Sequence, residues 1–281
     1  MIGFRSLYFS LAGHEIHVTE WGDPASPALV MAHGLVRQGR DFDTAAARLA
    51  ERFRVLCPDT IGRGLSSWSA APERDYTLSG YVHLAASLLD ALGVAICAWV
   101  GTSMGGLIGM AAAAGPLRGR IARLVLNDIG PVIDPAAVER IRTYGGHIPD
   151  FDGVVAYEAF LRRVYAPFGA LTDAEWRRMA ETSARRRDDG RITVHYDPRI
   201  VQVFAQAGQT PDLWEAYDGL ACPVLVLRGA ESDMLTPEVA GAMTRRGPRA
   251  GLVTVPGCGH APALNVPSQL DVVERFLEGG W

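Results

Sequence analysis

The feature that most constrains this chain is residues 101–106 (GTSMGG), which lie between two apolar runs. The run before it, residues 94–100, has the length of a buried strand, and the Ala-rich run 107–114 is typical of a buried helix. Glycines around the serine allow a sharp strand-to-helix turn, and the G-x-S-x-G pattern in that context exposes the serine hydroxyl at the strand tip. The segment predicts Ser103 as a nucleophile, with the Met104 amide at the helix N-terminus aimed at the same point. A Gly-Ser-Gly cluster can also be only a turn, so the interpretation depends on the rest of the chain.

Composition limits the classes of function. The chain has 281 residues, 48% of them hydrophobic and 21% charged, which is typical of a soluble globular protein with one large domain or a core carrying an insertion. The net charge is −4 and the basic residues are scattered, so we expect neither a nucleic-acid partner nor an anionic membrane surface.

Targeting and ligand signals are absent from the sequence. No apolar run approaches the roughly 20 residues that span a bilayer, and the first residues lack a signal-peptide layout, which predicts a cytoplasmic protein. The four cysteines show no paired spacing and are expected to be reduced. No His/Cys/Asp cluster has metal-ligand spacing, so we expect no metal and no cofactor.

Strand-like and helix-like segments alternate through most of the chain. Residues 4–22 predict an antiparallel opening, and helical spacing follows at 42–53, 81–92 and 268–277. Short, uniformly apolar runs predict strands buried on both faces, at 28–32, 54–58, 94–100, 121–126, 223–228 and 251–256. This alternation indicates an α/β fold with a mostly parallel, doubly wound sheet, whose functional loops gather at the carboxyl ends of the strands.

The pattern changes at Pro131 and returns to strands after residue 215. We therefore predict two core segments, 1–130 and 216–281, separated by a helical cap or lid at 131–215. Within that insertion the sequence contains no convincing buried strand. Helices are predicted there at 135–145, 153–165, 172–188 and 198–207.

A serine hydroxyl needs a base, usually an imidazole that a carboxylate orients. His260 is the best candidate for the base, because it stands between glycine and alanine in a loop directly after the last predicted strand. Asp233 follows strand 223–228 and is our first choice for the carboxylate. Glu231 in the same loop and Asp128 after strand 121–126 remain as alternatives, Asp128 with a structural role as its other interpretation.

The loop after strand 28–32 supplies a candidate for the oxyanion hole. His33-Gly34 allows a close backbone approach, so the Leu35 amide is predicted as a second oxyanion donor beside the Met104 amide. Four further residues are candidate substrate contacts, with surface positions or ordinary packing as their alternative interpretation: Arg37, Arg40, Trp68 and Tyr144.

Together these residues resemble an α/β-hydrolase of the capped type, related to microbial esterases, enol-lactonases and C–C bond hydrolases. The resemblance covers nearly the whole chain and rests on His33-Gly34, the loop 59–66, the GTSMGG turn, the Asp233 loop and Gly259-His260. It implies an α/β-hydrolase fold with an inserted helical cap, in which Ser103, Asp233 and His260 act as nucleophile, acid and base. Dehalogenases and epoxide hydrolases of this fold attack with an aspartate, which the serine at position 103 excludes.

The resemblance implies a hydrolase that cleaves an ester or lactone of a small, largely apolar substrate through an acyl-enzyme on Ser103. A C–C bond hydrolase and a cofactor-free perhydrolase are alternatives on the same residues. A ligand-binding receptor of the same fold is the alternative outside enzymology. The expected partner is the small-molecule substrate, and the sequence is compatible with a homodimer.

Overall fold

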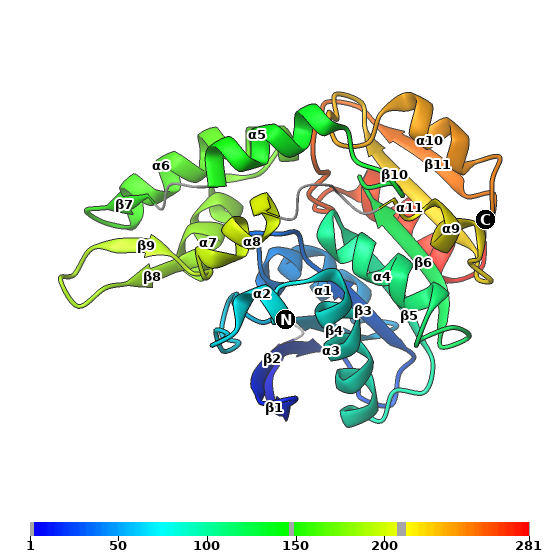
Figure 1. Ribbon diagram of the computed structural model, residues 1–281, viewed down its shortest axis with the longest axis horizontal. Helices are drawn as coiled ribbons and strands as arrows, with labels where there is room; N and C mark the ends of the chain where they lie inside the picture. The colour runs from blue at the N-terminus through cyan, green and yellow to red at the C-terminus, as the bar shows by residue number, and fades with distance from the viewer. Residues whose placement is uncertain (1–2, 146–148, 207–211, 281) are drawn as a thin grey trace.

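A central sheet of eight strands organises the computed structural model, which describes residues 3–145, 149–206 and 212–280 (Figure 1). The strand order is β1-β2-β4-β3-β5-β6-β10-β11. The strands are β1 (Phe4–Leu11), β2 (His14–Trp21), β3 (Ala28–Ala32), β4 (Arg54–Pro58), β5 (Cys97–Thr102), β6 (Ile121–Asn127), β10 (Val224–Gly229) and β11 (Gly251–Val255). Strand β1 pairs antiparallel with β2, and β2 pairs antiparallel with β4, whereas all other pairs are parallel. The predicted α/β-hydrolase fold with a mostly parallel sheet is confirmed.

Helices cover both faces of the sheet because successive side chains of its buried strands point to opposite sides. Val30 and Trp99 belong to the core beneath α3 and α4, and Leu29 and Val100 belong to the core beneath α1 and α11. The helices outside the insertion are η1 (Gly39–Phe42), α1 (Asp43–Leu49), α2 (Pro72–Asp75), α3 (Leu78–Ala91), α4 (Met104–Ala114), α9 (Trp214–Asp218), α10 (Pro237–Met243) and α11 (Pro267–Leu277).

Strand β5 begins three positions later than the apolar run 94–100 predicts. Helix α3 is followed by a glycine with positive φ, Gly93 (φ 67°). The Val94 amide then donates back to the Leu89 carbonyl of the helix. Residues 94–96 therefore belong to the helix-to-strand connection, and the strand extends to Thr102, directly before the serine.

The chain between β6 and β10 forms a separate layer over the carboxyl ends of the parallel strands (Figure 1). Its two ends are joined, since the Leu213 amide donates to the Pro131 carbonyl (2.9 Å). Its elements are α5 (Pro135–Gly145), β7 (Asp150–Phe151), α6 (Val154–Val164), η2 (Ala166–Phe168), α7 (Asp173–Ser183), β8 (Ala184–Arg186), β9 (Ile192–Val194) and α8 (Arg199–Gln206).

This cap contains a small sheet that the sequence does not predict. The helix expected at 172–188 ends at Ser183, and β8 and β9 form an antiparallel hairpin whose turn contains Gly190 (φ 83°). Strand β7 pairs with the other side of β9. Ile192 and Val194 point from β9 into the cap's own apolar core against α6 and α7.

A buried polar network attaches the cap to the core. The Tyr76 hydroxyl donates to Asp197 Oδ2 (2.7 Å), the Asp197 amide donates to the Gly62 carbonyl (2.8 Å), and Arg199 reaches the Ser69 carbonyl (2.8 Å). The end of the cap therefore rests on the loop that follows β4. No helix within the described ranges is long and apolar enough to cross a lipid bilayer.

Candidate active site

Ser103 occupies a strained turn between β5 and α4. Its backbone has φ 53° and ψ −117°, a conformation that non-glycine residues rarely adopt. Glycines make the turn possible, because a Cβ on Gly101 would lie 2.3 Å from the Gly105 carbonyl oxygen, and one on Gly105 would lie 2.0 Å from the Ala32 carbonyl oxygen. The chain thus presents the Ser103 hydroxyl at the carboxyl edge of the sheet.

His260 reaches Ser103 from the loop between β11 and α11. Its Nε2 lies 3.0 Å from Ser103 Oγ. The loop is held from the cap side, since the Gly259 amide donates to the Pro167 carbonyl (2.7 Å). The structure therefore brings together two residues that are 157 positions apart in the sequence, as expected for a nucleophile and its base.

Asp128 completes the hydrogen-bonded chain. Its Oδ2 lies 2.7 Å from His260 Nδ1 and also accepts a hydrogen bond from the Ser232 hydroxyl, and its Oδ1 accepts from the Gly229 amide (2.8 Å). The side chain is fully buried, so these donors replace the water that an exposed carboxylate would bind. Because the carboxylate accepts from Nδ1, the neutral imidazole carries its proton there, and Nε2 is free to accept from Ser103.

The prediction that Asp233 contacts His260 is therefore wrong. Asp233 lies in the loop after β10 with an exposed side chain, and Asp128 has the position next to Nδ1. Strand β6 lies between β5 and β10, so the residue after β6 is nearer to the serine. From the β10 loop, the Ser232 hydroxyl donates to the Asp128 carboxylate, and Glu231 is exposed as well.

The loop after β3 lies directly against Ser103, because a Cβ built on Gly34 would be 3.7 Å from the Ser103 Cβ. His33 braces this loop. Its Nε2 accepts from the Thr60 amide (3.0 Å), so the proton is on Nδ1, which donates to the Gly34 carbonyl (2.8 Å). Burial is the main reason why the pKa of His33 is lowered to about 4, which keeps the imidazole neutral.

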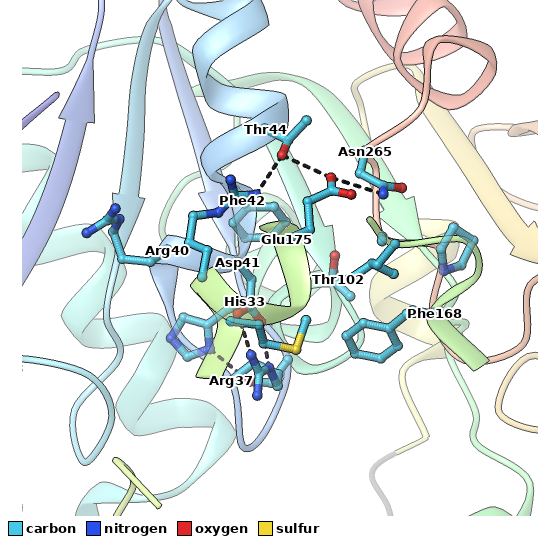
Figure 2. Close-up of a pocket in the computed structure, with 17 residues that line it drawn as sticks. His33, Arg37, Arg40, Asp41, Phe42, Thr44, Thr102, Phe168, Glu175 and Asn265 are labelled. Atoms are coloured by element: carbon cyan, nitrogen blue, oxygen red, sulfur yellow. Dashed lines mark hydrogen bonds and ion pairs between the residues drawn. The ribbon is translucent and has the colours of Figure 1, made fainter. Parts of the chain in front are cut away.

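A cavity of about 620 Å³, including its open mouth, lies between this loop and the cap (Figure 2). Its walls come from the β3 loop with α1, from Thr102, from the loop 261–265 and from α7 of the cap. Glu175 on α7 spans the cavity wall, accepting hydrogen bonds from Thr44 (3.2 Å) and Asn265 (3.1 Å), as Figure 2 shows. The sequence analysis does not single out Glu175, whose partners across the cavity, Thr44 and Asn265, are 131 and 90 positions away along the chain.

Two of the four predicted substrate contacts line this cavity. Arg37 is only 5% exposed and is held by both carboxylate oxygens of Asp41 (2.6 Å each). Although burial alone would lower the pKa of Arg37, the Asp41 charge raises it above the ordinary value. Arg40 also lines the cavity and pairs with Asp43 (2.6 Å).

Of the other two predicted contacts, Trp68 does not line this cavity. Trp68 is 38% exposed and packs under the Arg185 guanidinium, 4.6 Å from its ring centre. The Tyr144 side chain lies outside the part of the chain that the structure describes.

Buried polar residues that the sequence analysis did not single out stabilise the same edge. Asn127 is fully buried and donates through Nδ2 to Thr102 Oγ1 and to the Pro262 carbonyl (2.9 Å each), which links β5 to the His260 loop. His195 of the cap accepts from the Gly64 amide (3.3 Å), and burial is the main cause that lowers its pKa to about 3. Within the described ranges, no group of three or more His, Cys, Asp or Glu side chains could hold a metal ion.

Comparisons with known proteins identify the family of this chain. A model of the alpha/beta hydrolase family matches residues 29–273. A 3-hydroxybutyrate-oligomer hydrolase of Cupriavidus necator is 39% identical over 290 aligned residues, covering 99% of this chain and 98% of the relative. A 2-(acetamidomethylene)succinate hydrolase of Mesorhizobium japonicum is 28% identical and covers 87% of this chain and 84% of the relative.

Solved structures give the same result. An alpha/beta hydrolase from Novosphingobium aromaticivorans superposes with a TM-score of 0.89 at 36% identity, covering 99% of both chains. A crystal structure of E-2-(acetamidomethylene)succinate hydrolase superposes with a TM-score of 0.86 at 25% identity, covering 98% of this chain and 100% of that one. The relatives of named activity include an oligomer hydrolase and esterases, which support hydrolase activity. By its sequence and its fold, the chain belongs to the alpha/beta hydrolase family.

Proposed function

We propose that this protein is a serine hydrolase that cleaves ester bonds, with Ser103 as nucleophile, His260 as base and Asp128 as the carboxylate that orients the base. The observation that carries the proposal is the continuous hydrogen-bonded chain from Ser103 Oγ through His260 (3.0 Å) to Asp128 (2.7 Å). Asp128 fixes the tautomer in which Nε2 can accept the serine proton, and its charge stabilises the imidazolium that then forms.

Acylation follows from this geometry. Ser103 Oγ attacks the ester carbonyl carbon while its proton passes to His260 Nε2, and the carbonyl oxygen becomes an oxyanion. We propose the amides of Leu35 and Met104 as its donors. Met104 is the first residue of α4, so its amide has no partner within the helix, and the Leu35 loop lies against Ser103 through Gly34. The intermediate collapses, the ester C–O bond breaks, and the alcohol leaves with the proton from His260.

Deacylation repeats the cycle with water. His260 Nε2 takes a proton from the water that attacks the acyl carbonyl, and the second tetrahedral intermediate expels Ser103 Oγ. His260 returns the proton to the serine, and the carboxylic acid leaves. Each proton taken up is released again, so the cycle needs no metal or organic cofactor.

The substrate class that we propose is an ester of a short hydroxy acid. The relative from Cupriavidus necator, 39% identical over nearly the full length of both chains, is a 3-hydroxybutyrate-oligomer hydrolase. The cavity is lined by Thr102 and Ala261, the sequence neighbours of Ser103 and His260. It suits a small substrate with polar groups, because apolar residues such as Phe168 and Met179 share its wall with Arg37, Arg40 and Arg178. A linear dimer or trimer of 3-hydroxybutyrate is therefore the first substrate to test.

The test combines turnover with active-site labelling. We expect hydrolysis of the 3-hydroxybutyrate dimer and of p-nitrophenyl butyrate, and stoichiometric labelling by a serine-directed phosphonate. Ser103→Ala should abolish labelling and lower kcat about 10⁴- to 10⁶-fold, because nucleophile and base act as a unit. Ser79→Ala, at an exposed serine of α3, is the matched control and should change neither. Labelling without turnover of any ester or lactone would instead favour a receptor of the same fold.

A further inference from the structure

Arg63 is a fully buried arginine in the loop that follows β4. The sequence pattern places Arg63 in a glycine-rich, polar loop, where an arginine would ordinarily be exposed. Instead its guanidinium lies behind the Ser103 turn, between the loop after β3 and the start of α4. The side chain is therefore not a surface group, and its position needs a physical explanation.

The contacts of Arg63 join the two segments that flank Ser103. Its Nε donates to the Leu35 carbonyl (2.8 Å), and a terminal nitrogen lies 3.4 Å from the Met104 sulfur. Leu35 and Met104 are the residues whose amides we propose as oxyanion donors. One side chain thus holds both residues of the proposed oxyanion hole from behind.

The remaining donors of Arg63 fix the guanidinium itself. The second terminal nitrogen donates to the Ile61 carbonyl (2.8 Å) and to the Tyr81 hydroxyl (2.6 Å). The Tyr81 ring also lies against the guanidinium, 4.9 Å from ring centre to Cζ. These contacts leave the arginine little freedom to move, so the positions of its other two partners are fixed as well.

The charge of Arg63 is not neutralised by an ion pair. No carboxylate of the described residues lies within 4.0 Å of the guanidinium, whereas Arg37 and Arg40 nearby are each paired with an aspartate. A buried cation without a counter-ion is costly, and carbonyls and a hydroxyl compensate only part of that cost. A negative charge that forms transiently in front of the same loop would gain from this field.

The field of Arg63 reaches that loop. Burial is the main cause of the lowered pKa of His33, and the Arg63 charge lowers it further. His33 is adjacent to Gly34, whose Cα lies beside Ser103. The Asp59 and Asp41 charges act on the same imidazole in the opposite direction, so the Arg63 charge is one of several that reach the side of the loop where the ester oxygen would become charged.

We infer that Arg63 is a positioning residue for the oxyanion hole: it holds the Leu35 and Met104 segments in place from behind, and among the described residues its positive charge there has no ion-pair partner. This inference rests on the proposed serine hydrolase function. It predicts that Arg63 stabilises the transition state more than it stabilises the bound substrate, since the full negative charge exists only after attack.

The experiment compares Arg63→Met, which removes the charge at similar volume, with Arg63→Lys, which keeps it. Rates are normalised to the serines that a phosphonate titrates, so that misfolded protein does not count. We expect Arg63→Met to lower kcat about 10- to 100-fold, somewhat less than the loss of one oxyanion donor, with KM changed less than about threefold. Arg63→Lys should recover a substantial part of kcat.

A second readout separates this role from simple stability. The affinity of a trifluoromethyl ketone, which forms a charged tetrahedral adduct on the serine, should fall in Arg63→Met by the same factor as kcat/KM. The affinity of the product acid should not change. Arg54→Met is the control for a lost, partly buried arginine, because Arg54 pairs with Glu20 at the opposite end of β4; it should lower stability and leave normalised kcat unchanged.

Two results would overturn the inference: a normalised kcat of Arg63→Met equal to that of the wild type, or a kcat loss without any loss of trifluoromethyl ketone affinity. If the wild type hydrolyses no ester, the proposed function fails. The role of Arg63 is then tested by the rates at which diethyl p-nitrophenyl phosphate inactivates the wild type and Arg63→Met. That reaction also builds negative charge on an oxygen beside Ser103, so Arg63→Met should be about 10- to 100-fold slower. Equal inactivation rates would exclude the role.

Discussion

Replacing Asp128 with asparagine tests the hydrogen-bonded chain on which the proposed function depends. The substitution changes one oxygen to an NH₂ group without changing the volume. The Gly229 amide can only donate, so the asparagine oxygen is required at the Oδ1 position. The NH₂ group then faces His260 Nδ1, which must become an acceptor, and the imidazole proton moves to Nε2. In that tautomer His260 cannot take the proton of Ser103.

The magnitude follows from comparing the two orientations of the amide. Turning it over would restore the correct tautomer but would set NH₂ against the Gly229 amide, leaving a buried donor unsatisfied at a cost of about 1–3 kcal/mol. The turned amide would also lack the negative charge that stabilises the imidazolium. A wrong tautomer lowers kcat about 10⁴-fold in serine proteases, equivalent to about 5.5 kcal/mol. We therefore expect Asp128→Asn to lower kcat between about 10³- and 10⁴-fold.

Asp233→Asn is the matched control, because it makes the same chemical change at an exposed position in the adjacent loop. We expect its kcat to stay within about twofold of the wild type, since surface substitutions have small effects. The assay is p-nitrophenyl butyrate hydrolysis at pH 7–8, with far-UV circular dichroism to show that both variants are folded. Equal losses in the two variants, or a larger loss in Asp233→Asn, would refute the assignment of Asp128.

Two further predictions concern the structure around the serine. Burial lowers the pKa of His33 to about 4, so the folded state holds the imidazole in its neutral form, whereas the unfolded chain takes up a proton below about pH 6.5. The contribution of His33 to the free energy of unfolding is therefore complete above about pH 6.5 and is lost as the pH falls toward 4. Between these two pH values, the free energy of unfolding of the wild type, measured by urea titration, should fall by about 3 kcal/mol more than that of His33→Asn. Parallel pH profiles of the two proteins would contradict this. Gly105→Ala should destabilise the fold by about 2–3 kcal/mol, because its Cβ would lie 2.0 Å from the Ala32 carbonyl oxygen. Gly153→Ala, where a Cβ meets nothing within 4 Å, is the control, and equal melting temperatures of the two variants would be the contrary result.

The parts of this molecule that the sequence predicts are those that local sterics determine. The turn at Ser103 needs small residues because Gly101 and Gly105 pass within contact distance of neighbouring backbone, and that requirement is visible as a glycine pattern. The parallel strands are predictable for a similar reason. A strand buried on both faces must be apolar at every position, and β3, β4 and β6 are nearly so.

The carboxylate was not predictable in the same way. Strands β6 and β10 end at the same edge of the sheet, so the sequence places both Asp128 and Asp233 near the histidine without deciding between them. The direction of the backbone directly after β6 determines which carboxylate reaches the histidine. Asp128 adopts a positive φ (56°), while its amide donates to the Leu227 carbonyl of the neighbouring strand. A single aspartate with that conformation leaves no pattern in the sequence.

The small sheet of the cap escaped prediction because its strands are too short to show a period. Strands β8 and β9 have three residues each, and only Ile192 and Val194 alternate inward. An alternation over three positions is indistinguishable from part of a helical turn. The charged residues before β9 then favour a continuous solvent-exposed helix, which the hairpin turn at Gly190 contradicts.

Buried arginines are the hardest feature to predict, and they bear most directly on function. In the sequence, Arg37 and Arg63 both follow a glycine-containing loop, and nothing there distinguishes them from surface arginines. In the structure both are buried beside Ser103, but Arg37 is neutralised by Asp41 whereas Arg63 is held by carbonyls and a hydroxyl. A neutralised arginine mainly shapes the cavity wall, while an unpaired one imposes a field on whatever charge forms nearby. The difference between the two therefore depends on which partners the fold supplies, and it is the three-dimensional arrangement that supports the positioning role that we propose for Arg63.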